Sequence, residues 1–149
     1  MAFQFALSPV LWLREIAEER EEKLLQRILK EIAATTELID RVEAELAAAD
    51  AARRAELARR CDGVHLLAWY EHIEELRRKR SGFAQKLEKL EELRCKQMQA
   101  YTAARSSRQI LDQMRDRERT IYDGVAARRE QSRLDDSFGS RRARRNAHR

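Results

Sequence analysis

The feature that most constrains how this chain folds is a heptad seam over residues 25–49. The residues between its members are mainly charged or small. A single narrow apolar stripe on a helix has to be covered by another helix, as in a coiled coil. The members follow one another at alternating steps of three and four residues: Leu25, Ile28, Ile32, Thr35, Ile39, Val42, Leu46 and Ala49.

The composition agrees with long exposed helices. Of the 149 residues, 38% are charged and 6% are aromatic, and the chain has four Gly and one Pro. Such a chain has too little apolar material for a thick globular core, and patterned Ala, Glu, Leu, Arg and Lys are typical of coiled coils. We therefore predict an all-α protein built from long helices.

Turn signals divide the chain into two helices. Ser8 and Pro9 offer a helix cap and a first helical residue, and no other Gly or Pro occurs before Gly63. The run Cys61-Asp62-Gly63 is the strongest turn signal in the sequence. We predict a first helix over about residues 9–60, a turn at about 61–63, and a second helix over about 64–136 that folds back as an antiparallel coiled coil. Residues 1–136 would form this hairpin, and residues 137–149 a basic disordered tail.

The second helix carries a matching seam, again at steps of three and four: Leu66, Trp69, Ile73, Leu76, Arg80, Phe83, Leu87 and Leu90. Ser81-Gly82 leaves two alternatives, namely one continuous helix or a short helix near the turn followed by a long one. Beyond Leu90 the stripe can be continued only after a three-residue slip, which predicts a local overwinding of the helix. Its members would be Leu93, Gln97, Ala100, Ala104, Ser107, Leu111, Met114, Glu118, Ile121 and Val125.

Folding back at the turn predicts the register of the pair. Positions whose numbers sum to about 124 should face each other, so that residues 25–46 meet residues 78–99. Traced towards the N-terminus, the first seam becomes polar at Glu18 and Glu21. The same register places these two acids near Arg105 and Arg108, and we predict that this charge match selects the antiparallel pairing.

Signatures of catalysis are missing from the sequence. No Gly-rich phosphate loop, Gly-x-Ser-x-Gly or His-Glu-x-x-His motif occurs, so we expect no enzyme activity and no cofactor. Cys61, His65 and His72 have helix-compatible spacing, but a strong zinc pattern would offer four ligands in two close pairs, so we predict no metal. Two distant cysteines fit a reducing compartment, and no signal peptide or membrane span is evident, which favours the cytoplasm.

Two further stretches are candidates for contacts with partners. Trp69 and Tyr70 adjoin the predicted turn, where they either pack under the end of the first helix or leave Tyr70 as part of an interaction patch. The last ten residues carry five Arg and no acid, which accounts for the whole net charge of +5. This tail favours an acidic protein partner or solubility over RNA, because it lacks interleaved aromatic residues.

Three motifs are spread over the chain: Phe3-x-Phe5-x-Leu7-x-x-Val10-Leu11-x-Leu13-Arg14-x-x-x-Glu18, Tyr70-x-x-Ile73-x-x-Leu76, and Arg128-Arg129-Glu130-Gln131-x-x-Leu134-Asp135-Asp136. In these motifs the sequence resembles the flagellar FliJ family of the type III export apparatus. His72 stands where the family often has an aromatic residue.

The resemblance implies a non-enzymatic stalk that inserts into the hexameric export ATPase and promotes its assembly and activity. It also implies contact with the membrane export gate and with export chaperones, at the cytoplasmic face of the inner membrane. Carried over by position, the ATPase would contact Arg14, Glu18, Arg128, Arg129 and Glu130. The gate would contact Tyr70, Ile73 and Leu76, with Trp69 beside them.

Three interpretations follow from the sequence. The first is the export stalk, a monomer on its own because its seam is covered within one chain. The second is an unrelated scaffolding coiled coil, and the third is a basic helical rod that binds nucleic acid.

Overall fold

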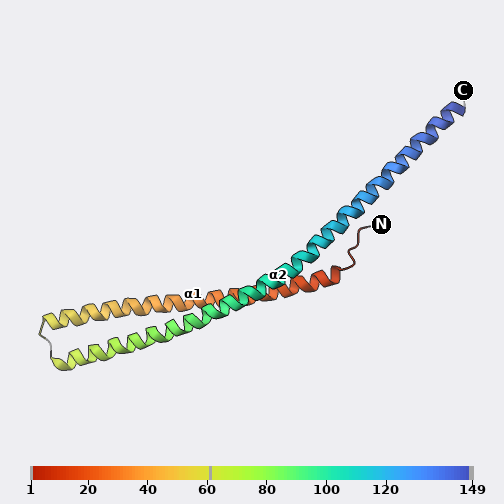
Figure 1. The fold of residues 1–149 in the computed structure, drawn as a ribbon. Coiled ribbons are helices and arrows are strands. Elements are labelled where there is room, and N and C mark those ends of the chain that lie inside the picture. Colours follow the sequence, from red (N-terminus) through yellow and green to blue (C-terminus); the bar gives the residue numbers. More distant parts are fainter. Residues whose placement is uncertain (1, 61, 148–149) are drawn as a thin grey trace. The chain divides into compact units, whose positions relative to one another are not determined.

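The computed structural model describes residues 2–60 and 62–147, with side chains as far as Arg142. It consists of two helices, α1 (Ser8–Ala58) and α2 (Gly63–Ala147), which lie antiparallel on either side of a short turn (Figure 1). Among the described residues there is no strand. The predicted all-α antiparallel hairpin is confirmed.

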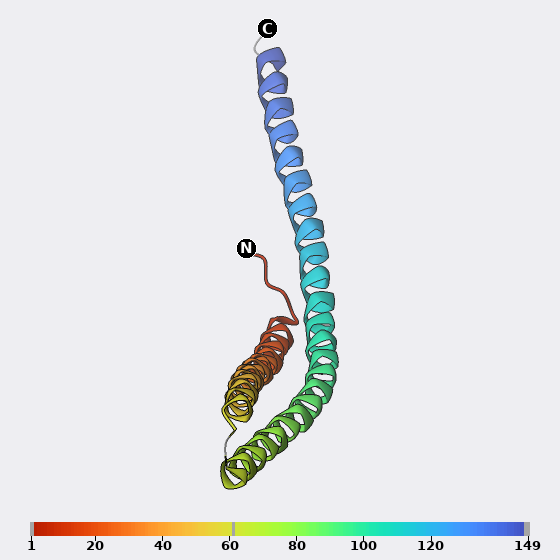
Figure 2. The ribbon, with the colours of Figure 1, turned by 90° about the vertical axis from the view of Figure 1, so that its left-hand side faces the viewer.

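Helix α2 is continuous through Ser81 and Gly82, so the alternative with a separate short helix near the turn is wrong (Figure 2). A Cβ atom at Gly82 would meet nothing within 4 Å, so this glycine is not required by any close contact. The helix also runs past Asp136 to Ala147, where the sequence predicted a disordered tail. Residues 137–147 contain no proline and are rich in Arg, a good helix former, so nothing in their sequence stops the helix.

The core follows the two predicted seams. In heptad notation, Leu25 of α1 and Leu66 of α2 stand at position a, and every member of the first seam is buried or half-buried. The central cluster joins Val42 and Ala49 of α1 to Ile73 and Leu76 of α2. Thr35 occupies one d position and is 1% exposed, so a hydroxyl lies within the apolar stripe.

Beyond Leu90 the seam of α2 keeps its phase, which corrects the predicted slip. Leu93 is 49% exposed, whereas Arg94 and Gln97 are half-buried. The following a and d positions are half-buried in turn: Tyr101, Ala104, Arg108, Leu111 and Arg115. Long polar side chains cover the partner helix with their stems while their heads reach acids or solvent. The helix therefore preserves its regular winding by accepting polar residues in the seam.

Among the described residues of the turn, Arg60 has a strained backbone. Arg60 has a φ of 57°, in the left-handed region that favours glycine. The backbone N–H groups of Arg59 and Arg60 donate to the carbonyls of Glu56 and Leu57, at 3.0 and 3.3 Å, which closes the end of α1. Cys61, within the predicted turn at 61–63, lies outside the described residues.

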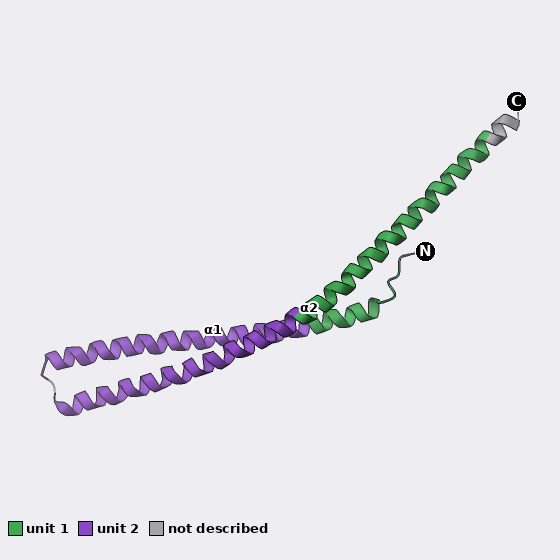
Figure 3. Cartoon of the chain, in the orientation of Figure 1, with its two compact units in different colours: residues 1–18, 103–149 green, residues 19–102 purple. Residues whose placement is uncertain are grey.

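The chain divides into two compact units (Figure 3). Unit 1 comprises residues 1–18 and 103–149, and unit 2 comprises residues 19–102. Unit 2 contains the turn and the apolar seams, and unit 1 contains both ends of the chain.

Candidate interaction surfaces

Unit 1 contains an ion cluster that spans its two helical segments. Arg108 of α2 donates to the carboxylates of Glu18 on α1 and Asp112 on α2, and Arg115 lies 3.1 Å from Asp112. The side chains of Glu18, Asp112 and Arg108 are 14%, 21% and 27% exposed. The hydrogen bond to Glu18 raises the pKa of Arg108 above its ordinary value, against the opposing effect of desolvation. The prediction that Arg108 lies near the two acids is confirmed for Glu18.

The second predicted acid finds a different partner, which lies in unit 2. Gln97 donates its side-chain amide to the carboxylate of Glu21 and to the Glu21 backbone carbonyl, the latter at 3.0 Å. Arg105, which the predicted register also places near the two acids, is exposed at an e position. The amide reaches Glu21 because Gln97 stands at a d position within the seam, whereas the e position of Arg105 lies beside the seam. Farther along unit 2, Arg80 pairs with Glu43 at 2.7 Å, in keeping with the predicted register.

The N-terminal segment of unit 1 folds against α2. The Ser8 hydroxyl donates to the Phe5 carbonyl at 2.8 Å, so it closes a turn before α1 and does not have the predicted capping role. Phe5 is buried, and the Phe3 ring lies 5.6 Å from the ring of Tyr122 at an angle of 56°. Trp12, one helical turn into α1, remains 61% exposed.

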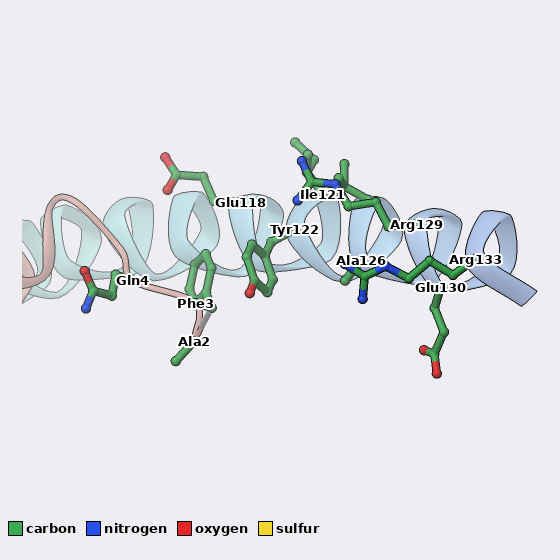
Figure 4. Close-up of a pocket in the computed structure, with 11 residues that line it drawn as sticks. Ala2, Phe3, Gln4, Glu118, Ile121, Tyr122, Ala126, Arg129, Glu130 and Arg133 are labelled. Atoms are coloured by element: carbon green, nitrogen blue, oxygen red, sulfur yellow. The ribbon is translucent and has the colours of Figure 1, made fainter.

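An open groove of about 930 Å³ lies between this segment and α2 (Figure 4). Its apolar part is formed by Phe3, Ile121 and Val125, and its polar part includes Arg129 and Glu130. Ile121 is 66% and Val125 40% exposed, so the apolar part is accessible. The other lining residues are Ala2, Gln4, Glu118, Tyr122, Ala126 and Arg133.

All five residues predicted to contact an ATPase fall in unit 1. Arg129 and Glu130 line the groove, and Arg14 and Arg128 are exposed on their helices. Glu18 is engaged by Arg108 within the ion cluster. The sequence signalled the charged residues but missed the groove, because the course of residues 2–7 cannot be read from a heptad pattern.

The four residues predicted to contact an export gate lie in unit 2, near the turn. Ile73 and Leu76 are 6% and 1% exposed and belong to the central cluster, so they hold the helix pair together and are not part of its surface. Trp69 packs against that cluster, and its ring meets His72 edge-on at 6.2 Å. Tyr70 is 57% exposed.

Tyr70 is exposed, as one of the two sequence alternatives predicted, and it belongs to an apolar patch whose other members the sequence interpretation missed. Leu57 on α1 and Tyr70 on α2 both occupy e positions, which lie on the same side of an antiparallel pair. Leu67 and Val64 extend the patch on α2, and exposure ranges from 50% at Leu57 to 72% at Val64. Apolar residues outside the a and d positions were the signal that could have revealed it.

Metal and membrane sites are not evident in the structure. No group of three or more His, Cys, Asp and Glu side chains that could hold a metal occurs among the described residues. His65 and His72 are exposed, while Cys61, the third residue of that candidate site, is outside the described part of the chain. Neither helix, over its described length, is apolar enough to cross a bilayer.

Comparison with protein families decides the assignment. The family model described as Flagellar FliJ protein matches residues 3–148. The chain belongs to the FliJ family. Membership implies a stalk role in flagellar protein export, structural in kind, within the apparatus that serves bacterial motility. No curated protein and no solved structure matches the FliJ chain.

Proposed function

We propose that this FliJ-family chain is the central stalk of the flagellar export apparatus and that unit 1 binds the hexameric export ATPase. The supporting observation is that the groove between the N-terminal segment and α2 combines accessible apolar side chains with Arg129 and Glu130. These are two of the five residues that the family resemblance assigns to the ATPase. Binding through this groove would favour the hexamer and raise its rate of ATP hydrolysis.

The apolar patch of Leu57, Val64, Leu67 and Tyr70 would contact the cytoplasmic domain of the export gate. Tyr70 is the member that the family pattern also indicates, and aromatic side chains often dominate binding energy. Export chaperones would be further partners, and no nucleic acid is required. These contacts would hold the chain at the cytoplasmic face of the inner membrane, and the free chain would be a monomer.

The groove can be tested with two matched substitutions. Val125→Glu places a charge in the apolar part of the groove. Leu134→Glu likewise replaces an exposed aliphatic side chain with Glu, at a position that is not among the groove residues. We expect Val125→Glu to weaken binding to the purified export ATPase and Leu134→Glu to leave it close to that of the unmodified chain. Equal binding by both variants would rule out the groove as the ATPase site.

A further inference from the structure

The two flanks of the helix pair in unit 1 differ in chemistry. In an antiparallel pair the e positions of both helices share one flank and the g positions share the other. The e flank of unit 1 is charged, with Glu15 on α1 and Arg105, Asp112 and Arg119 on α2. The g flank carries no charge over the same length: its members are Val10, Ala17, Ser107 and Met114.

The apolar character of the g flank extends outwards to the neighbouring c positions. Val10 and Met114, at g, are 40% and 39% exposed, whereas Leu13 and Ile110, at c, are 57% and 59% exposed. The exposures on the two helices match, as expected if the g residues form the floor of a shallow apolar trough and the c residues its rims. Four large apolar side chains are thus accessible on one flank, and an exposed apolar patch of this kind is typical of a site that binds a partner.

Charge indicates what covers this flank. The c and g positions of residues 3–18 and 103–128 include no Asp or Glu, while they do include Arg117 and Arg128. Both arginines are exposed, and neither forms an ion pair with another described residue. The same flank of a second copy would offer no acid to pair with these arginines, so the flank does not complement itself in charge.

We propose that the g flank of unit 1 binds a third helix, supplied by another protein, whose apolar stripe is bordered by glutamate or aspartate. Its apolar side chains would pack on Val10, Leu13, Ile110 and Met114, and its acids would pair with Arg117 and Arg128. The complex would be a local three-helix coiled coil, a mode of recognition in which an amphipathic helix lies in an apolar groove. The four apolar contact residues are not among those that line the groove beside Phe3, although Ile121 of the same flank does line it. The proposal does not depend on binding of the ATPase.

The experiment uses the full chain and a synthetic amphipathic helix of about four heptads with Leu and Ile in its stripe and Glu on both sides. A second peptide carries Lys in place of every Glu. Binding is measured by fluorescence anisotropy against the unmodified chain, Leu13→Glu and Trp12→Glu. Leu13 and Trp12 are adjacent, similarly exposed at 57% and 61%, and lie on opposite flanks, so the second variant is a matched control.

We expect the Glu-bordered peptide to bind and the Lys-bordered peptide to bind about tenfold more weakly. Leu13→Glu should weaken binding of the Glu-bordered peptide by about tenfold or more, and Trp12→Glu should leave it within about twofold. Arg117→Glu combined with Arg128→Glu should reverse the preference between the peptides. If Leu13→Glu lowers the helix content in circular dichroism, Ile110→Glu on the other helix replaces it.

Three results would overturn the proposal: no binding of the Glu-bordered peptide, equal binding of both peptides, or equal loss in the Leu13 and Trp12 variants. Sedimentation equilibrium of the chain alone can give a fourth result that would overturn the proposal. A dimer that becomes a monomer with Leu13→Glu but not with Trp12→Glu would show that a second copy covers this flank.

Discussion

Substitution of Leu76 tests whether this residue contributes to folding or to partner binding. It is 1% exposed between the two helices, in a position that the family pattern associates with the export gate. Leu76→Ala removes three carbon atoms, and at about 0.8 kcal/mol for each the loss of burial is about 2.4 kcal/mol. Because a residual cavity adds to this cost, the free energy of unfolding should fall by about 2–4 kcal/mol. The assay is urea unfolding followed by circular dichroism.

The matched control is Leu67→Ala on the same helix, where the side chain is 58% exposed. The chemical change and the helix propensities are the same, so the difference between the two variants reports burial alone. Leu67→Ala should cost about 1 kcal/mol or less. A Leu76→Ala variant as stable as Leu67→Ala would refute the placement of Leu76 in the core. Weaker gate binding by Leu67→Ala at near-unchanged stability would support the surface role of the patch around Tyr70.

Three other substitutions test particular features by thermal and urea unfolding. Thr35→Val removes a hydroxyl from the apolar seam and should stabilise the chain by about 1 kcal/mol, whereas a loss of stability would mean that the hydroxyl has a partner. Arg60→Gly removes the steric strain of a left-handed backbone at the end of α1 and should raise the free energy of unfolding by about 1 kcal/mol. An unchanged free energy of unfolding would argue against the φ of 57°. Glu18→Arg and Arg108→Glu should each lower the unfolding temperature, and the double variant should recover part of the loss because the ion pair forms again with its charges exchanged. The recovery should be incomplete because the new carboxylate at position 108 would lie near Asp112. Absence of any recovery would contradict the pairing across the two helices.

The hairpin was predictable because its information is local and repetitive. Alternating steps of three and four residues identify the seam of the first helix. The turn signal at residues 61–63, followed by a matching seam, identifies the second helix as its partner. The burial of Leu25, Val42, Leu76 and Leu90 follows from those two facts. The pairing of Glu18 with Arg108 followed from the register that they imply.

The phase of α2 beyond Leu90 could not be predicted by hydrophobicity alone. Searching for apolar residues favours Leu93 and Met114, but the helix keeps Arg94 and Arg108 in the seam. Continuous helical winding and the reach of arginine outweigh the burial of two apolar side chains, which remain on the surface. Met114 is informative in turn, because it belongs to the flank of unit 1 proposed to bind a third helix.

The interaction surfaces were predictable only in part. Charged residues such as Arg129 and Glu130 were identified from the resemblance, but Tyr70 alone of the four gate residues has a mainly exposed side chain. The resemblance also assigns Ile73 and Leu76 to the gate, because a pattern of aliphatic residues does not distinguish a buried core from a surface. The groove depends on how residues 2–7 pass along α2, for which the heptad pattern has no information.

The most direct test of the stalk proposal is the rate of ATP hydrolysis by the purified export ATPase as the full chain is added. The account predicts that the unmodified chain raises the rate and promotes the hexamer, that Val125→Glu raises it less, and that Leu134→Glu behaves as the unmodified chain does. A hydrolysis rate and a hexamer fraction that stay constant at every concentration of the chain would contradict the account.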